Sequence, residues 1–125
     1  MSILIIKDRS EALYTGLPMN DAHAVVKWTE GDESVYFSLT QRGRALSIHI
    51  AAGSRHSMLK LRKAVDDFVA WCFSTFDWCG MILGVVGPQS VVNLAKKCGF
   101  IEVLKDKKHI DGILQNVSIV IRKRA

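Results

Sequence analysis

The chain has 125 residues, of which 49% are apolar and 23% charged, and this balance excludes collagen-like and disordered proteins. A chain of this length is expected to fold as a single domain, residues 1–125, because two separate cores would both be marginal. No apolar run reaches the ~20 residues that a membrane span needs. We therefore expect a cytoplasmic protein with no membrane partner.

The net charge of +5 favours anionic partners. The basic residues form several small clusters rather than one block, among them Lys105 to Lys108 and the tail Arg122 to Arg124. Two interpretations stay open: a solvated basic surface, or nucleic-acid binding through these two clusters. The tail favours the second interpretation, because it follows a strand and is expected to have nothing to pack against.

Three cysteines, Cys72, Cys79 and Cys98, lie in apolar stretches and form no CxxC pair. We expect them to be free core thiols in a reducing compartment. The four histidines show no ligand spacing with the cysteines or with one another, so no metal site is predicted.

The first half of the chain has the alternating pattern of β-strands. Strands are predicted at Ser2 to Lys7, Ala24 to Thr29, Ser34 to Thr40 and Ala45 to Ala51, with a hairpin between the second and third and a short helix within Glu11 to Ala22. In the fourth strand, Leu46, Ile48 and Ile50 share one face. Ser47 and His49 share the other.

The second half begins with a helical period. The spacing predicts an amphipathic helix over Leu59 to Phe76, with Ser57 as its N-cap, and a short helix over Gln89 to Cys98 that Gly99 closes. Strands are predicted at Met81 to Val86, Phe100 to Leu104 and Val117 to Arg122, with a polar connection over Lys105 to Gly112. Trp71 and Trp78 fall partly off the long helix's apolar stripe. They either cover a sheet edge or form the interface of a homodimer.

The segment from Ala45 to Val103 resembles the core of the GNAT superfamily, the GCN5-related N-acetyltransferases. The matching parts are, in order, ALSIHIAAG, GSRHSM, LKLRKAVDDFVAWCF, MILGVV, PQSVVNLAKKC and the helix ending Lys97-Cys98-Gly99-Phe100. The resemblance implies a mixed α/β fold: a central, mostly antiparallel sheet with a splayed pair of parallel strands, flanked by helices. In size and in its departures from the family motifs, the chain is similar to GNAT-like proteins of tailed bacteriophages.

The resemblance further implies acetyl-CoA as acyl donor, held between the strands Ala45 to Ala51 and Met81 to Val86. Its pantetheine arm is expected to pair with the backbone of Ile50, Ala51 and Ala52. A strand that turns into a helix presents unpaired N–H groups that suit a pyrophosphate. The residues implied at that place, with two from the second helix, are Arg55, His56, Ser57, Met58, Leu59, Lys60, Ser90 and Asn93.

Two departures from the family pattern bear on activity. Met58 and Lys60 stand where the phosphate loop of the family has glycines, so Lys60 either contacts phosphate directly or is solvated. Ala95 stands where the family often has a tyrosine acid. His49, near the end of its strand, is the candidate catalytic base, and its alternative is a packed or surface histidine.

Two functions therefore stay open at this point. In the first, the chain is an N-acyltransferase that moves acetyl from acetyl-CoA to an unidentified amine by direct attack. In the second, it is a catalytically degenerate GNAT-like scaffold with a binding or structural role, for example in a phage virion.

Overall fold

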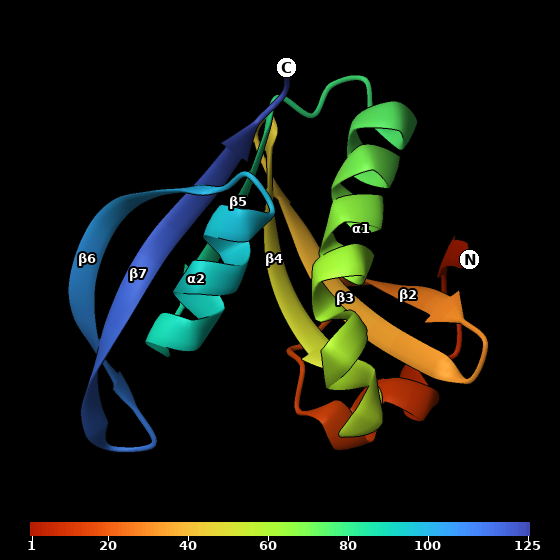
Figure 1. The fold of residues 1–125 in the computed structure, drawn as a ribbon, viewed down its shortest axis with the longest axis horizontal. Helices are drawn as coiled ribbons and strands as arrows, with labels where there is room; N and C mark the ends of the chain where they lie inside the picture. Colours follow the sequence, from red (N-terminus) through yellow and green to blue (C-terminus); the bar gives the residue numbers. More distant parts are fainter.

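The sheet that organises this protein has seven strands in the order β1-β2-β3-β4-β5-β7-β6 (Figure 1). The computed structural model describes all residues from 1 to 125. The strands are β1 (Ser2–Ile5), β2 (Ala24–Glu30), β3 (Glu33–Arg42), β4 (Ala45–Ala52), β5 (Met81–Val86), β6 (Ile101–Ile110) and β7 (Ile113–Lys123). The helices are α1 (Leu61–Thr75) and α2 (Gln89–Lys97), with two 3₁₀ helices, η1 (Arg9–Thr15) and η2 (His56–Lys60). None of these helices combines the length and apolar content that crossing a membrane requires.

Every neighbouring pair of strands is antiparallel except β4 and β5, which run parallel. The β4–β5 pairing ends at Ile48 and Gly84, although β4 continues to Ala52 and β5 to Val86. Beyond that point the two strands diverge, and Figure 1 shows the sheet opening there. The mixed α/β class, the mostly antiparallel sheet and its splayed parallel pair are confirmed.

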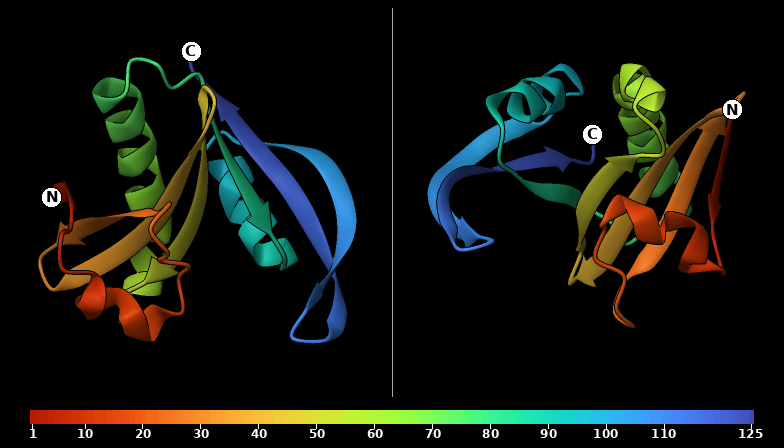
Figure 2. Two further views of the ribbon diagram at one scale, coloured as in Figure 1. Left: turned by 180° about the vertical axis from the view of Figure 1, so that it is seen from behind. Right: turned by 90° about the horizontal axis from the view of Figure 1, so that it is seen from below.

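The two α-helices cover one face of the sheet, and η1 lies on the opposite face of its β2–β4 half (Figure 2). The predicted apolar stripe of α1 is buried, and it includes Val65, Phe68 and Cys72. Phe68 stacks on Phe37 of β3 with ring centroids 3.9 Å apart, so α1 is fixed against the middle of the sheet. Trp71 lies against Phe68, so it packs on the chain's own core. The homodimer stays a prediction.

The start of α1 differs from the prediction. The helix begins at Leu61, and residues 56–60 form η2, so Ser57 is not the N-cap of α1. The reason is a tertiary contact: Ser57 is buried, and its hydroxyl donates to Glu33 Oε2 at 2.6 Å. A side chain held by β3 in this way does not cap the helix that follows it.

The closing hairpin is longer than predicted. Strands β6 and β7 continue through the polar segment to a turn at Asp111 and Gly112, which have φ of 52° and 77°. An Asp-Gly pair with positive φ at both positions makes the tight turn that joins antiparallel strands. The residues beyond Leu104 were missed because both faces of the ribbon are exposed there, so no apolar alternation marks the strands.

The basic tail does have packing partners, contrary to the prediction. The Arg124 guanidinium donates to the carbonyls of Phe73, Phe76 and Cys79 at 2.7–2.8 Å, where α1 ends. Arg122 donates to the carbonyl of Cys98, the C-cap of α2. Both arginines therefore donate to backbone carbonyls at or just beyond the C-terminal ends of the two helices, where carbonyls lack intrahelical partners.

Candidate functional site

Where β4 and β5 part, the backbone of β4 faces an open gap. The Gly53 N–H donates to Ser34 O at 2.7 Å, which makes this pair a hydrogen-bonded pair of the β3–β4 ladder. Hydrogen-bonded pairs alternate along an antiparallel ladder, so the register assigns the backbone groups of Ala51 and His49 to β3. Those of Ile50 and Ala52 point the other way, toward the gap, beyond the last residue that pairs with β5. Of the three residues whose backbone was predicted to contact the pantetheine arm, Ile50 and Ala52 face the gap, and Ala51 does not.

An apolar cavity of about 60 Å³ lies inside this gap. Nine of its ten lining residues are hydrophobic, and those that belong to the two strands and to α2 include Ile48, Ile50, Gly84, Val86, Leu94 and Ala95. Ala95 stands where the GNAT family often has a tyrosine, so the cavity wall has no hydroxyl at this position. The cavity can therefore take an apolar group but offers it no side-chain acid.

A larger groove of about 520 Å³ adjoins the cavity and runs between the first turns of α1 and α2. Ile50, Leu94 and Val91 line both the cavity and the groove, so the two adjoin along these residues, and together they are called the path. The outer wall is made by the loop after β4, residues 53–55, together with Met58. A ligand that is narrow and extended at one end and bulky at the other fits this shape.

Gly53 allows the loop to approach β3 closely. A Cβ at this position would lie 2.1 Å from Ser34 Oγ and 2.9 Å from Ser34 O, which no side chain can do without displacing the backbone. The Gly53 carbonyl accepts a hydrogen bond from the hydroxyl of Tyr14 on η1, and Tyr14 also lines the groove. The sequence analysis missed Tyr14, because a single tyrosine on a short helix carries no periodic signal.

The predicted phosphate-binding residues do not stay together in the structure. Arg55 and Met58 line the groove. Leu59 is 80% exposed and does not line the groove. His56, Ser57 and Lys60 do not line the groove either, and each of them contacts an acidic residue at the β2–β3 turn. His56 Nε2 lies 3.2 Å from Glu33 Oε1, Ser57 donates to Glu33 Oε2, and Lys60 Nζ donates to Glu30 Oε1 at 3.3 Å.

Helix α2 presents a different face to the groove from the one predicted. Val91 and Leu94 line it, whereas Ser90 and Asn93 do not. Asn93 Oδ1 accepts a hydrogen bond from Gln89 Nε2 at 3.0 Å along the exposed side of the helix. The polar residues were chosen for their chemistry, but the apolar residues one position away are the ones that point toward the sheet.

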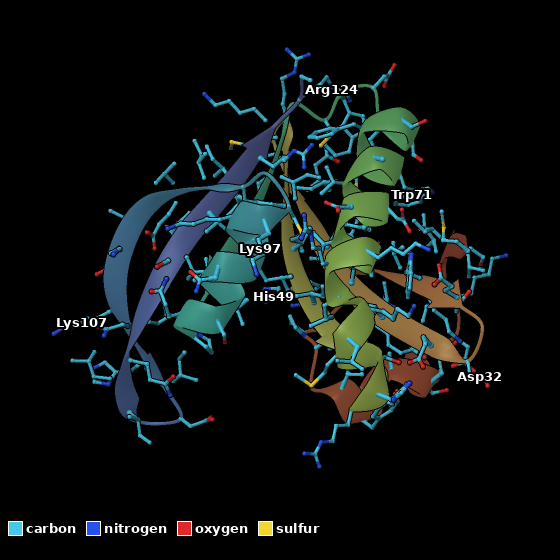
Figure 3. All side chains as sticks on the ribbon, in the orientation of Figure 1. Asp32, His49, Trp71, Lys97, Lys107 and Arg124 are labelled. Atoms are coloured by element: carbon cyan, nitrogen blue, oxygen red, sulfur yellow. The ribbon has the colours of Figure 1, made fainter.

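His49 is the first residue of β4 after the pairing with β5 ends. It alternates with Ile48 and Ile50, so its side chain leaves the sheet on the face opposite α1 and α2. Figure 3 shows it beside the gap between β4 and α2. The side chain is exposed, yet partial desolvation, followed by the charges of His23 and Lys108, lowers the pKa of its imidazole below 6.5. A neutral imidazole at the point where the strands part is able to accept a proton.

The three cysteines are free and buried, as predicted. Burial is the first cause that raises the pKa of Cys98, to about 11, and it also raises the pKa of Cys72. Neither thiol is ionised near neutrality, so neither is a nucleophile there. His49 is the titratable side chain of the β4 residue at which the pairing with β5 has ended.

The same architecture occurs in solved structures of acetyltransferases. A spermidine N-acetyltransferase chimera from Vibrio cholerae and hSSAT superposes with a TM-score of 0.78, at 13% identity, over 98% of this chain and 94% of that one. The ribosomal-protein-S18-alanine N-acetyltransferase of Escherichia coli gives 0.72 at 10% identity, over 98% and 92% of the two chains. A Bacillus subtilis acetyltransferase in complex with CoA gives 0.65 at 16% identity, over 94% and 86%.

No family model matches the sequence, and no curated protein matches it. The likeness is therefore one of structure, and it covers nearly the whole chain. The chain has the fold of the GNAT acetyltransferases, including its parallel pair of diverging strands.

Proposed function

We propose that this protein is an N-acyltransferase that takes an acetyl group from acetyl-CoA and transfers it to an amine. The observation that carries the proposal is the pair of backbone positions Ile50 and Ala52, which face the gap without a strand partner. The pantetheine arm of coenzyme A contains two amide groups, and an extended amide chain pairs with a free strand edge. One of the structural neighbours was solved in complex with CoA, which supports this choice of donor.

The residues at the gap fit the parts of such a donor. The apolar cavity between β4, β5 and α2 has room for the thin end of the arm, and the groove toward Arg55 has room for the bulky end. In this reaction the amine nitrogen attacks the thioester carbonyl, and coenzyme A leaves as the thiol. We expect a backbone N–H group of β4 that faces the gap to polarise that carbonyl.

The acceptor amine would reach the gap from the face opposite the two helices, where His49 projects. We propose that the neutral imidazole of His49 takes the proton that the amine loses on attack. Its lowered pKa keeps it unprotonated at neutral pH. Two of the structural neighbours are named for amine substrates, spermidine and the alanine of a ribosomal protein. For this chain, the identity of the amine follows from neither name.

The second candidate is a GNAT-like scaffold without catalysis. Two features favour the scaffold. Ala95 stands in the cavity wall where the family often has a tyrosine acid. His56 and Lys60, in the loop expected to bind phosphate, contact Glu33 and Glu30 instead. We also propose a cytoplasmic location and a homodimer for this protein, and a role in a phage virion if it is a scaffold. The arginines of the tail hydrogen-bond to helix ends, so the tail no longer supports nucleic-acid binding. The exposed lysines of the β6–β7 hairpin are the remaining support for it.

Replacement of Ala52 by proline tests whether the free backbone of β4 binds the pantetheine arm. The Ala52 N–H faces the gap, so Ala52→Pro removes one ligand-facing donor and leaves the β3 ladder intact. The loss of one hydrogen bond, about 0.5–1.5 kcal/mol, should weaken CoA binding by roughly 2- to 12-fold in calorimetry. The matched control is Ala51→Pro, which removes a ladder hydrogen bond and should lower the melting temperature instead.

The outcomes separate the two functions. No binding of CoA to the wild-type chain at millimolar concentration rejects the transferase in favour of the scaffold. Binding that Ala52→Pro leaves unchanged, while the variant melts like the wild type, rejects the pairing of the arm with β4.

A further inference from the structure

Two carboxylates at the β2–β3 turn engage several of the polar side chains at the start of α1. Glu30 accepts hydrogen bonds from Lys60, at 3.3 Å, and from Lys63. Glu33 lies 3.2 Å from His56 Nε2 and accepts the hydroxyl hydrogen of Ser57. The hydrogen bond from Lys63 is the first cause that lowers the pKa of Glu30, so this carboxylate is ionised at neutral pH. Both lysines near this helix start, Lys60 and Lys63, are thus already paired with an anion, whereas Arg55 and Arg62 make no ion pair.

Three backbone donors of the same helix start are also engaged. The Ser57 N–H donates to Ser54 Oγ at 3.2 Å, and the Met58 N–H donates to the carbonyl of Arg55 at 3.4 Å. The Leu61 N–H donates to Met58 O, because η2 continues directly into α1. A diphosphate placed here would find the N–H groups of residues 54–56 free, but not those of Ser57, Met58 and Leu61. Free N–H groups are what makes a helix start an anion site.

Met58 and the exposed side chain of Leu59 add bulk where a phosphate would need to approach the backbone. Arg55 is the one cationic residue among those that line the groove. The gap between β4 and β5 is different, because its free backbone groups at Ile50 and Ala52 and its apolar cavity suit an uncharged amide chain. The recognition elements are therefore concentrated at the pantetheine end of the path.

We propose that this protein recognises its acyl donor through the pantetheine arm, so that a pantetheine thioester without the nucleotide is a donor comparable to acetyl-CoA. This inference rests on the proposed transferase function and specifies its donor class. The chemistry required is a β-alanyl-cysteamine arm with a thioester at its end. The nucleotide diphosphate contributes less to binding than the arm does, because Glu30 and Glu33 engage Lys60, Lys63, His56 and Ser57 at this helix start.

The test compares the dissociation constants of CoA and of pantetheine for the wild-type chain by isothermal titration calorimetry. We expect the two constants to differ by less than tenfold. A CoA affinity tenfold or more above that of pantetheine overturns the inference and leaves the transferase proposal standing. If neither ligand binds, the donor site itself is rejected, and the inference is rejected with it.

A charge-matched pair of variants then tests the role of the turn. Glu30→Gln releases Lys60 and Lys63, so CoA should bind at least threefold more tightly than to the wild type, with pantetheine unchanged. Asp32→Asn removes the same charge from the same turn but releases no cation, since Asp32 makes no ion pair (Figure 3). It should leave both affinities unchanged. Equal tightening in the two variants, or none in Glu30→Gln, contradicts the assignment of Glu30 as the group that blocks the phosphate site.

Discussion

Arg124 provides a stringent test of how the C-terminal segment holds the fold together. Its guanidinium donates three hydrogen bonds, at 2.7–2.8 Å, to the carbonyls of Phe73, Phe76 and Cys79, and it lies 5.0 Å from the centre of the Phe73 ring. In Figure 3 it lies where α1 ends and the connection to β5 passes. Arg124→Ala removes all of these contacts and leaves the carbonyls at the end of α1 without this partner.

The expected loss follows from those contacts. Three hydrogen bonds at about 0.5–1.5 kcal/mol each, two of them exposed, lower the free energy of unfolding by about 2–4 kcal/mol. For a domain of this size, each kcal/mol shifts the melting temperature by about 4 °C, so a drop of about 8–16 °C is expected. Differential scanning calorimetry measures it.

Lys123→Ala is the control, because Lys123 is an exposed neighbour with no ion pair or side-chain hydrogen bond in the structure. It should change the stability by no more than about 0.5 kcal/mol. Arg124→Lys keeps the charge but loses the planar fork, so it should recover less than half of the loss. If Arg124→Ala melts within about 2 °C of Lys123→Ala, the reasoning is refuted, and the tail is the solvated basic segment that the sequence suggested. Truncation of the last four residues is no clean test of nucleic-acid binding, because it removes both helix-end arginines.

Three further changes test the site. Gly84→Leu should fill the cavity and abolish CoA binding in calorimetry, whereas Gly84→Ala should bind normally, since a Cβ there meets its nearest neighbours, Val120 and Ile48, at 3.7 and 3.9 Å. His49→Ala should lower turnover by roughly 10²–10⁴-fold with the dissociation constant of CoA unchanged; unchanged turnover would assign proton removal to water. Because the pKa of His49 is lowered from the ordinary value of 6.5, the midpoint at which the wild-type rate falls with decreasing pH should lie below 6.5, and the variant should lack that inflection. Gly53→Ala should lose about 1–3 kcal/mol in urea denaturation, because its Cβ meets Ser34 Oγ and O, and Ser34→Ala should restore only part of it. Equal stability of Gly53→Ala and the wild type would contradict the close approach.

The sequence by itself determined the elements that have a period. The alternation in β4 placed Ile48 and Ile50 on the face that lines the cavity, and the three- and four-residue steps placed Val65, Phe68 and Cys72 in the core. The parallel pair was implied by the resemblance to the GNAT core, and its physical reason is the crossover through α1, which joins parallel strands. These are local properties, because a strand or helix presents its residues at fixed spacing wherever it packs.

Only the tertiary structure decided which groups pair across the chain. The sequence offered Arg55, His56 and Lys60 as equivalent phosphate contacts, yet Arg55 lines the groove and the other two contact Glu33 and Glu30. Lys60 and Glu30 are 30 positions apart, and what brings them together is the packing of η2 against the β2–β3 turn. Such pairings follow from where turns and helix ends meet in space. A charged side chain takes whichever opposite charge the fold brings within reach, and no spacing along the chain records that choice.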